Sequence, residues 1–217
     1  MCGRCTLYLD ENDILNAFEL DELLTNWAPK YNVAPSQQVL AVTGEQPRAA
    51  AGLTWGINIH SEREQRDIQL INIRSETVLE KGHFRQPRYK PCLILANGFY
   101  EWRRDTGKQP FFFHLTNNEP FAFAGLWTTE KQAGKETGVC AILTCQPNSV
   151  VSGVHNRMPV ILPKEIRKEW LQAQSLADYK RFLVPYPAER MSSHPVGKQI
   201  NRPTYDAPDC ISEINAG

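Results

Sequence analysis

The sequence predicts a single α+β domain, built around a curved, barrel-like and mostly antiparallel β-sheet with peripheral helices. Its 217 residues are 41% hydrophobic and 22% charged, which is enough apolar material for one sizeable core. Short runs of β-branched and aromatic residues occupy the middle of the chain, between one helical pattern near the start and two near the end. No repeat or low-complexity linker divides the chain, so we expect one domain over residues 1–217.

Three segments are expected to form the helices. Apolar residues recur at roughly helical spacing in Asp10–Leu24, with acids on the other face. Pro163–Gln172 begins with a proline, which is favoured in the first turn of a helix. Ser175 and Asp178 have the spacing of a capping box, and they predict a third helix that ends near Leu183.

The strands are expected in short runs rich in β-branched or aromatic residues and separated by turn signals. These runs are Val39–Val42, Leu70–Ile73, Cys92–Trp102, Pro110–Leu115, Phe121–Trp127 and Val139–Cys145. The turn signals are Asn117-Asn118, residues 105–107 and Gly134. Short strands framed by three helices are what the predicted fold class requires.

The composition also limits the function classes. Lys and Arg together number 24, as do Asp and Glu, which gives a net charge of zero and a pI near 7.0. This excludes a globally basic nucleic-acid binder but leaves room for a local basic patch. No run approaches the roughly 18 apolar residues of a membrane span, and no secretory signal follows the start. We therefore expect a soluble, cytoplasmic protein that is a monomer.

The six cysteines do not predict a metal site. Cys2 and Cys5 form a C-x-x-C pair and Cys140 and Cys145 lie five apart, whereas a structural zinc site needs four convergent ligands. In the expected strand Val139–Cys145, positions five apart point to opposite faces. We expect no metal, no organic cofactor and reduced thiols.

Cys2 is the first candidate for chemistry. Removal of the initiator methionine, which is usual before a small residue, leaves Cys2 with a free α-amine. That amine has a pKa of about 7.7–8.0, against about 10.4 for lysine, so more of it is neutral at pH 7. With the thiol it forms a 1,2-aminothiol, which can trap an aldehyde as a Schiff base that sulfur then closes to a thiazolidine. The same group can act as an N-terminal nucleophile on an amide, and a cysteine at this position can equally be accidental.

Three other polar residues are candidates for proton transfer or hydrogen bonding. Glu101 alternates with aromatic residues in an expected strand, so burial should raise its pKa toward the range useful for proton transfer. The alternative is a strand glutamate paired with Arg103 or Arg104. His155 lies in an expected loop, where a histidine is either structural or a proton carrier near neutral pH. Asn72 follows an apolar pair and can alternatively bond its own backbone at a strand end.

A basic segment at residues 81–90 is a candidate nucleic-acid contact. It contains Lys81, Arg85, Arg88 and Lys90 with no acid, and aromatic residues are interleaved among them. Such a segment suits phosphates and exposed bases. The alternative is a solvated loop.

Several short motifs follow one another along the whole chain. They are Met1–Arg4, Tyr31–Pro35, Trp55–Gly56, Asn72–Thr77, Gly98–Trp102, His155–Pro159 and Ser193–Val196. Together they resemble the SRAP (SOS-response-associated peptidase) family of abasic-site processing proteins. The resemblance implies the SRAP fold, a single α+β domain around a barrel-like sheet that binds single-stranded DNA in a positively charged cleft. It also implies that the N-terminal cysteine forms a thiazolidine with the ring-opened aldehyde of an abasic site.

The resemblance assigns roles to the matching residues. It implies a catalytic set of Cys2, Asn72, Glu101 and His155. In this set Glu101 is the general acid/base, His155 assists opening of the abasic sugar, and Asn72 orients the cysteine and the lesion. It further implies a DNA-contacting set of Arg4, Arg74, Thr144 and Arg157.

Two positions depart from the family pattern. Position 5 is usually aromatic in the family and is Cys5 here, a second thiol that could form a disulfide with Cys2 on oxidation. After Trp55–Gly56 the family commonly continues to a Pro-x-Trp element, whereas this chain continues with residues 57–60, without that tryptophan.

The function expected from these observations is that of an enzyme-like protein of the DNA damage response. It should crosslink to abasic sites in single-stranded DNA through Cys2, with associated lyase-type chemistry. Two alternatives stay open at this point. One is an N-terminal-nucleophile cysteine peptidase with self-processing, and the other is a non-catalytic module that binds single-stranded DNA.

Overall fold

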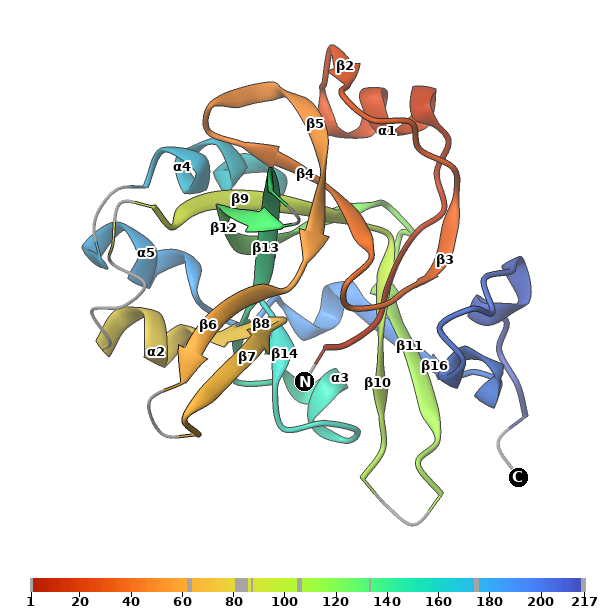
Figure 1. Ribbon diagram of the computed structural model, residues 1–217. Helices are drawn as coiled ribbons and strands as arrows, with labels where there is room; N and C mark the ends of the chain where they lie inside the picture. The colour runs from red at the N-terminus through yellow and green to blue at the C-terminus, as the bar shows by residue number, and fades with distance from the viewer. Residues whose placement is uncertain are drawn as a thin grey trace.

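β-Strands are the main regular structure of the chain, as the computed structural model shows for residues 2–61, 64–80, 86, 88–104, 107–132, 134–173 and 176–215 (Figure 1). In chain order the strands are β1 (Cys5–Leu7), β2 (Glu22–Leu23), β3 (Lys30–Val33), β4 (Gln38–Thr43), β5 (Gln46–Trp55), β6 (Ile57–Ser61), β7 (Arg66–Leu70), β8 (Asn72–Arg74), β9 (Lys90–Ala96), β10 (Gly98–Trp102), β11 (Pro110–Leu115), β12 (Phe121–Gln132), β13 (Lys135–Cys145), β14 (Met158–Pro159), β15 (Ile161–Leu162) and β16 (Met191–Pro195).

Strands β13, β12, β9, β4 and β5 close into a barrel. Neighbours in that order pair antiparallel, and β5 returns to pair in parallel with β13, with Thr54 opposite Val139 and Trp55 opposite Cys140. Strands β2, β8, β14 and β15 extend the barrel sheet at its margins. The predicted barrel-like, mostly antiparallel α+β fold is therefore confirmed.

A second sheet, in the order β16-β11-β10-β1-β3, packs beside the barrel and has two different faces. Phe99 joins the main core, whereas Tyr100 joins a smaller cluster with Phe112 and residues of the C-terminal segment. Successive side chains of β10 therefore point to opposite faces of this sheet. Gly98 is required by close packing, because a Cβ there would lie 2.3 Å from the ring of Phe112.

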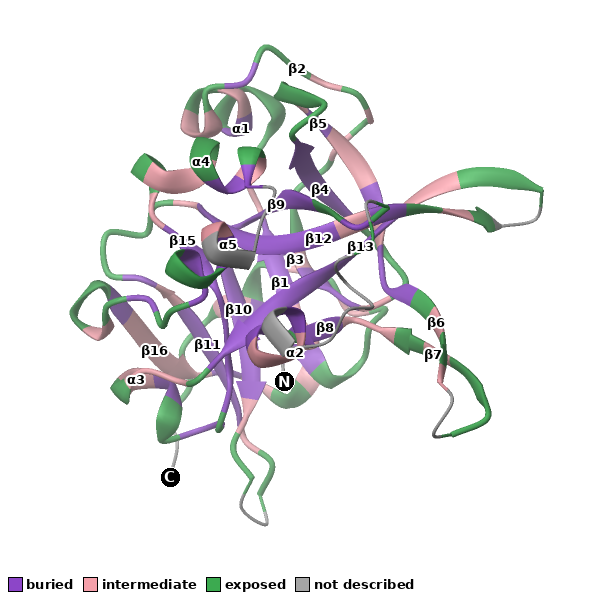
Figure 2. Ribbon diagram, turned by 90° about the vertical axis from the view of Figure 1, so that its left-hand side faces the viewer, coloured by how far each residue is buried: buried purple, intermediate pink, exposed green. Residues whose placement is uncertain are grey.

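The helices are short and lie on the outside of the sheets (Figures 1 and 2). They are α1 (Glu11–Phe18), α2 (Ser75–Glu80), α3 (Ser149–Ser152), α4 (Arg167–Gln172) and α5 (Leu176–Phe182), with 3₁₀ turns η2 (Lys164–Ile166), η3 (Ala188–Arg190), η4 (Lys198–Asn201) and η5 (Pro208–Ile211). Figure 2 shows β9 and the inner parts of β12 and β13 as mostly buried, while the outer ends of β12 and β13 and the hairpin of β6 and β7 project and are largely intermediate or exposed. In the described part of the chain no helix is long and apolar enough to cross a membrane.

The first predicted helix, Asp10–Leu24, is too long at its C-terminal end. Asp10 caps the helix, its side chain accepting from the Asp13 amide, but the helix ends at Phe18. Glu19 then adopts a left-handed conformation with φ 56°, which turns the chain into β2. The predicted helix Pro163–Gln172 is a 3₁₀ turn followed by α4, because Ile166 leaves the helical region.

Two predicted strands are each divided in the structure. Cys92–Trp102 breaks at Asn97, whose amide donates to the Thr6 carbonyl and whose side chain accepts from the Tyr8 amide, so that β9 and β10 enter different sheets. Leu70–Ile73 breaks at Ile71, between the hairpin strand β7 and β8. Of the earlier predictions, Ser175, the turn residues 105 and 106 and most of the basic segment 81–90 lie outside the described residues.

Candidate active site

The N-terminal segment is held beside β10 by backbone pairing. Cys5 lies opposite Phe99, and the amide of Tyr100 donates to the carbonyl oxygen of Arg4 at 3.0 Å. Because the two strands are antiparallel, this register brings the residues just before Cys5 alongside those just after Phe99. Cys2 is thereby brought into the neighbourhood of Glu101.

Cys2 lies in the interior of the protein. Its side chain is fully buried, and its Sγ lies 3.7 Å from the carbonyl oxygen of Arg4. The carbonyl oxygen of Cys2 accepts a hydrogen bond from Nδ2 of Asn72 at 2.7 Å. Burial raises the pKa of the Cys2 thiol well above its ordinary value of 9.0, and the charge of Glu101 raises it further. The thiol is therefore protonated near neutral pH.

Glu101 is a buried carboxyl group poised to exchange protons near neutral pH. It lies opposite Phe111 in the β10–β11 pairing and is 2% exposed. Burial raises its pKa from 4.5 to about 7, as the sequence predicts. Its Oε1 lies 3.7 Å from Nδ1 of His155. Of the two neighbouring arginines considered from the sequence, Arg103 lies over the ring of Phe111, and Arg104 contacts His155 while its charge lowers the pKa of Glu101.

His155 is positioned by the turn that follows α3. Its amide donates to the carbonyl oxygen of Val151 at 2.9 Å, and its Nδ1 lies 3.1 Å from the carbonyl oxygen of Arg157. Burial lowers the pKa of the imidazole below its ordinary value of 6.5. The ring is therefore mainly neutral at pH 7.

Arg104 is a site residue that the sequence did not reveal in this role. Its Nη2 lies 3.2 Å from Nε2 of His155 and donates to Oδ1 of Asn156 at 2.7 Å. A guanidinium has only donors, so in this contact Nε2 accepts, while Nδ1, the nitrogen that faces Glu101, also lies 3.1 Å from the backbone N–H of Arg157. No motif or spacing indicates this contact, because the two residues come from separate loops.

Asn72 and Arg74 are positioned by β8, which pairs in parallel with the end of β13. In this register Asn72 lies opposite Ile142 and Arg74 opposite Thr144. Asn72 points inward, and its Oδ1 is buried without a hydrogen-bond partner among the described residues. Arg74 is exposed, whereas Thr144 is fully buried with its Oγ1 3.4 Å from the carbonyl oxygen of Ile73.

Arg157 is buried and forms an ion pair with Glu76 of α2. Its two terminal nitrogens lie 2.7 and 2.9 Å from the two carboxylate oxygens, and Nη2 also donates to the carbonyl oxygen of Thr144. Only 8% of its side chain is exposed. The arginine thus links α2, β13 and the segment after His155. In this arrangement its charged end faces protein groups, not solvent.

Arg4 is also held by protein groups. Its guanidinium donates to Oδ1 of Asn32 at 2.8 Å, to the carbonyl oxygen of Ile200, and to that of Asn201 at 3.3 Å. It therefore connects the N-terminal segment to β3 and to η4. Of the three predicted arginines, Arg74 is the one whose side chain the structure leaves exposed.

The structure thus brings Cys2, Asn72, Glu101 and His155 together from four separate parts of the chain. The site combines a buried thiol, a carboxyl group with a pKa of about 7, a neutral imidazole and a side-chain amide. Such a set can move protons to and from a bound carbonyl or amine.

The thiols and possible metal ligands complete the description of the site. All six cysteines are buried and free of disulfide bonds, so Cys2 and Cys5 are both reduced here. Burial also raises the pKa of Cys5 to about 12. Within the part of the chain that the structure covers, no three His, Cys, Asp or Glu side chains are grouped as metal ligands.

Comparison with known proteins agrees with the motifs. The family model "SOS response associated peptidase (SRAP)" matches residues 1–203. The chain is 39% identical to the "Abasic site processing protein YoqW" of Bacillus subtilis (strain 168), over 97% of this chain and 99% of that protein. It is 28% identical to the "Abasic site processing protein HMCES" of Gallus gallus, over 88% of this chain and 68% of that protein.

Solved structures share the fold. A protein from Bacteroides thetaiotaomicron matches with a TM-score of 0.83 and 21% identity, over 98% of this chain and 100% of that chain. A protein from Bordetella bronchiseptica matches with a TM-score of 0.76 and 26% identity, over 90% of this chain and 100% of that chain. With the family match over nearly its whole length, the chain belongs to the SRAP family.

Proposed function

We propose that this protein processes abasic sites in single-stranded DNA by forming a covalent link through Cys2. The observation that carries the proposal is the convergence of Cys2, Asn72, Glu101 and His155 in one buried site. The names of the relatives, abasic site processing proteins, support the same substrate. Action as a cytoplasmic monomer is part of this proposal.

The first step is condensation of the Cys2 α-amine, freed by removal of Met1, with the ring-opened aldehyde of the lesion. The amine adds to the carbonyl carbon, and the resulting carbinolamine loses one water to give an imine. Glu101 is suited to this step because a carboxyl group with a pKa of about 7 can protonate the departing hydroxyl and take a proton back. His155, held 3.7 Å from it, can share the proton.

The second step is ring closure by the Cys2 thiol. Sulfur adds to the imine carbon, and the thiol proton is transferred to the imine nitrogen, which gives a five-membered thiazolidine. Because burial keeps this thiol protonated at neutral pH, closure requires a proton acceptor. The carboxylate form of Glu101, whose charge already acts on the thiol, can fill this role.

The DNA strand would approach from the side of Arg74, which we propose as a phosphate contact. Arg4, Thr144 and Arg157 belong to the same proposed interface. The two arginines reach phosphate only if they exchange their present partners, Asn32 and Glu76 respectively. In the present arrangement both arginines are bound to protein groups and hold the segments that form the site.

The experiment that tests the proposal is a denaturing gel with a single-stranded oligonucleotide that contains one abasic site. We expect a slow-migrating species whose mass equals protein plus DNA less one water, and none with the intact oligonucleotide. Cys2→Ala should abolish the stable species. Cys5→Ala, a matched buried cysteine without an adjacent amine, should retain it.

Two outcomes of the same experiment would point elsewhere. Retention of DNA only under native conditions would leave a binding module. Hydrolysis of a peptide without any adduct would favour the N-terminal-nucleophile peptidase. A protein whose N-terminus is extended by a tag should fail to crosslink, because its Cys2 nitrogen is an amide; equal yields would contradict the aminothiol mechanism.

Replacement of Glu101 by glutamine tests the proton-transfer role. Glu101→Gln keeps the shape of the side chain but cannot carry a proton, so the adduct should form about 10²–10⁴ times more slowly. Binding of intact single-stranded DNA should change little. Rapid-quench kinetics of adduct formation measures the effect, and an unchanged rate would remove Glu101 from the mechanism.

A further inference from the structure

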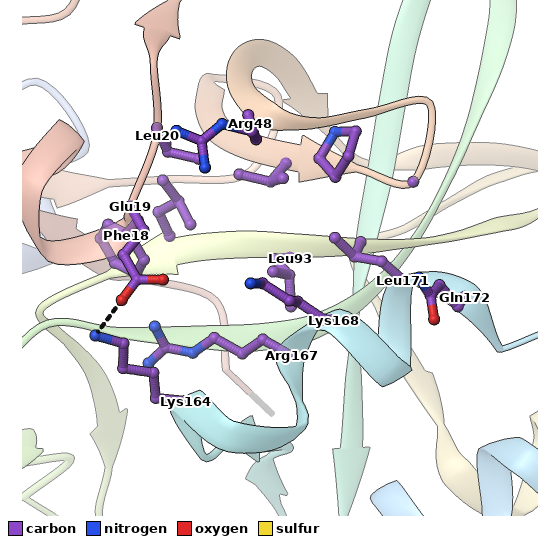
Figure 3. Close-up of a pocket in the computed structure, with 14 residues that line it drawn as sticks. Phe18, Glu19, Leu20, Arg48, Leu93, Lys164, Arg167, Lys168, Leu171 and Gln172 are labelled. Atoms are coloured by element: carbon purple, nitrogen blue, oxygen red, sulfur yellow. Dashed lines mark ion pairs between the residues drawn. The ribbon is translucent and has the colours of Figure 1, made fainter.

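A pocket lies between α1, the β4–β5 turn and α4, away from the residues of the proposed active site (Figure 3). Its volume is about 330 Å³, within the range of small-molecule sites. Its floor is apolar and is formed by Leu20, Val42, Leu93, Leu95 and Leu171. None of Cys2, Asn72, Glu101 and His155 lines it. The pocket therefore belongs to a different part of the fold from the proposed active site.

The rim of this pocket is cationic on both sides. Arg48 reaches in from β5, while Lys164, Arg167 and Lys168 come from η2 and α4 (Figure 3). Arg167 is partly withdrawn from water, since its guanidinium lies 5.3 Å from the ring centre of Phe18 and its Nε donates to the carbonyl oxygen of Leu162. Burial accordingly lowers the pKa of Arg167.

A carboxylate already occupies the mouth of the pocket. Glu19 forms an ion pair with Lys164 at 2.8 Å, and Lys164, Lys168 and Arg48 all lower the pKa of Glu19. Lys164 is the direct partner of this carboxylate, whereas Lys168 and Arg48 act on it from farther away, and the guanidinium of Arg48 is itself paired with the Asp21 carboxylate. Both partners of the ion pair are more than half exposed, so the pair is weak and can be exchanged.

Glu19 reaches the mouth of the pocket from an unfavourable backbone conformation. It ends α1 in the left-handed region, with φ 56° and ψ 46°, a position where glycine is usual. A residue with a side chain is unfavourable in that conformation and needs support from its surroundings. Here the support includes the ion pair to Lys164 across the pocket mouth.

We propose that this pocket binds a small amphipathic carboxylate, whose head takes the place of the Glu19 carboxylate among the cations and whose apolar body lies on the leucine-rich floor. The apolar floor excludes a fully polar anion as the preferred ligand. The cationic rim disfavours a neutral or positively charged one. In this arrangement Glu19 is a resident competitor for the head group.

Titration with sodium octanoate, followed by ¹H–¹⁵N NMR of the full chain, tests the proposal. Octanoate should shift the amide signals of Leu20, Gly44 and Leu171 in a saturable manner. Sodium butyrate, which lacks the apolar body, and 1-octanol, which lacks the charge, should each bind roughly tenfold more weakly or worse. Equal binding of octanol and octanoate would overturn the assignment, as would no saturable shift.

Two substitutions should change the affinity in opposite directions. Lys168→Glu should weaken octanoate binding by roughly tenfold, because a charge-assisted contact is replaced by repulsion. Glu19→Gln should strengthen it several-fold, because the competing carboxylate is removed while the backbone is kept. Lys198→Glu, an exposed lysine outside the pocket, gives the same change in net charge and should leave the affinity unchanged.

Structural damage would not produce this pattern. A destabilised pocket would bind octanoate more weakly in both variants, and that result would contradict the proposal. The yield of abasic-site adduct should stay the same in all three variants. The outcome therefore does not depend on the function proposed for Cys2.

Discussion

At the scale of single residues, the candidate site is defined by what burial does to each titratable group. It raises the pKa of Glu101 to about 7, raises that of the Cys2 thiol and lowers that of His155. All three changes favour the neutral form. The site is thus built for proton exchange among groups that are mainly uncharged near pH 7.

Arg104 should set the pH at which this exchange operates. Its positive charge lowers the pKa of both Glu101 and His155, so Arg104→Gln should raise both. If the carboxylate of Glu101 is the active form in ring closure, the rising limb of the crosslinking rate should move to higher pH. The rate of adduct formation between pH 5.5 and 9 measures this shift.

The neighbouring arginine offers the matched control. Arg103 is exposed and lies over the ring of Phe111, so Arg103→Gln removes the same charge from the same strand end without touching His155. Its pH profile should stay close to that of the wild type. Identical profiles for wild type and Arg104→Gln would show that Arg104 does not position His155.

At the scale of elements, Arg157 connects the segment after His155 to α2 through Glu76 and to β13 through Thr144. Glu76→Gln leaves a buried guanidinium without its counter-charge and should lower the free energy of unfolding by about 1–2 kcal/mol at pH 7, a value reduced because Glu76 is 44% exposed. Urea unfolding measures it. Glu165→Gln, at an exposed acid, serves as the control.

The same pair predicts the pH range of its own contribution. The hydrogen bonds from Arg157 lower the pKa of Glu76 below its ordinary 4.5. The folded state thus favours the carboxylate, and the stabilisation is present above pH 4.5 and lost as the pH falls through the lowered pKa. The difference between wild type and Glu76→Gln should shrink in acid; a constant difference would assign the cost to packing.

The elements that could be predicted from the sequence are those with strong local composition. β11 has the predicted bounds, and Phe121–Trp127 and Val139–Cys145 lie within β12 and β13. β5 was not predicted because its centre, Ala49–Gly52, has low strand propensity and is recruited by pairing with β4. The break at Asn97 was missed although Asn97-Gly98 is a turn-type pair, because apolar residues resume directly at Phe99; the chain changes sheets there.

In the candidate site, too, some features could be predicted from the sequence and others could not. The sequence motifs predicted the four residues Cys2, Asn72, Glu101 and His155. The aromatic neighbours of Glu101 predicted its burial. Their contacts did not follow, because Arg104–His155 and Arg157–Glu76 join segments far apart in sequence. The phosphate roles of Arg4 and Arg157 stay predictions, since local patterns do not show whether a guanidinium faces protein or solvent.

At the scale of the whole molecule, the ionisation of Glu101 should oppose folding. Its pKa is about 7 in the folded state and 4.5 ordinarily, so the native state binds this proton more tightly. The contribution of the protonated carboxyl group to the free energy of unfolding is fully present below pH 4.5, and it is lost as the pH rises through about 7. Glu101→Gln cannot ionise, so at pH 8 it should be more stable than wild type by up to about 3 kcal/mol.

Thermal unfolding at pH 4.5 and pH 8 checks this expectation. The gain from Glu101→Gln should be largest at pH 8 and should fall away at pH 4.5. Glu22→Gln, at an exposed position, should show no such dependence. A gain that is equal at both pH values would mean that Glu101 is not desolvated in solution.

Because the net charge is zero, DNA binding must depend on local positive groups. The salt dependence of the binding affinity measures how many of these groups contact phosphates. Arg74→Ala should reduce the log–log salt slope for intact single-stranded DNA by about 0.7, the value of one phosphate contact. Arg190→Ala, at an exposed arginine of η3, should leave the slope unchanged. Filter-binding affinities between 50 and 200 mM salt measure both, and an unchanged slope for Arg74→Ala would exclude it from the interface.

The closure of the barrel has a consequence for how the protein is made. Closure depends on β5 pairing with β13, so Thr54 must wait for Val139 to be synthesised. Such a non-local contact forms late, because a long loop must be closed first. Cys2 leaves the ribosome first, but Asn72, Glu101 and His155 follow in succession. A nascent chain shorter than about 155 residues therefore carries the aminothiol without the complete set of groups that direct it.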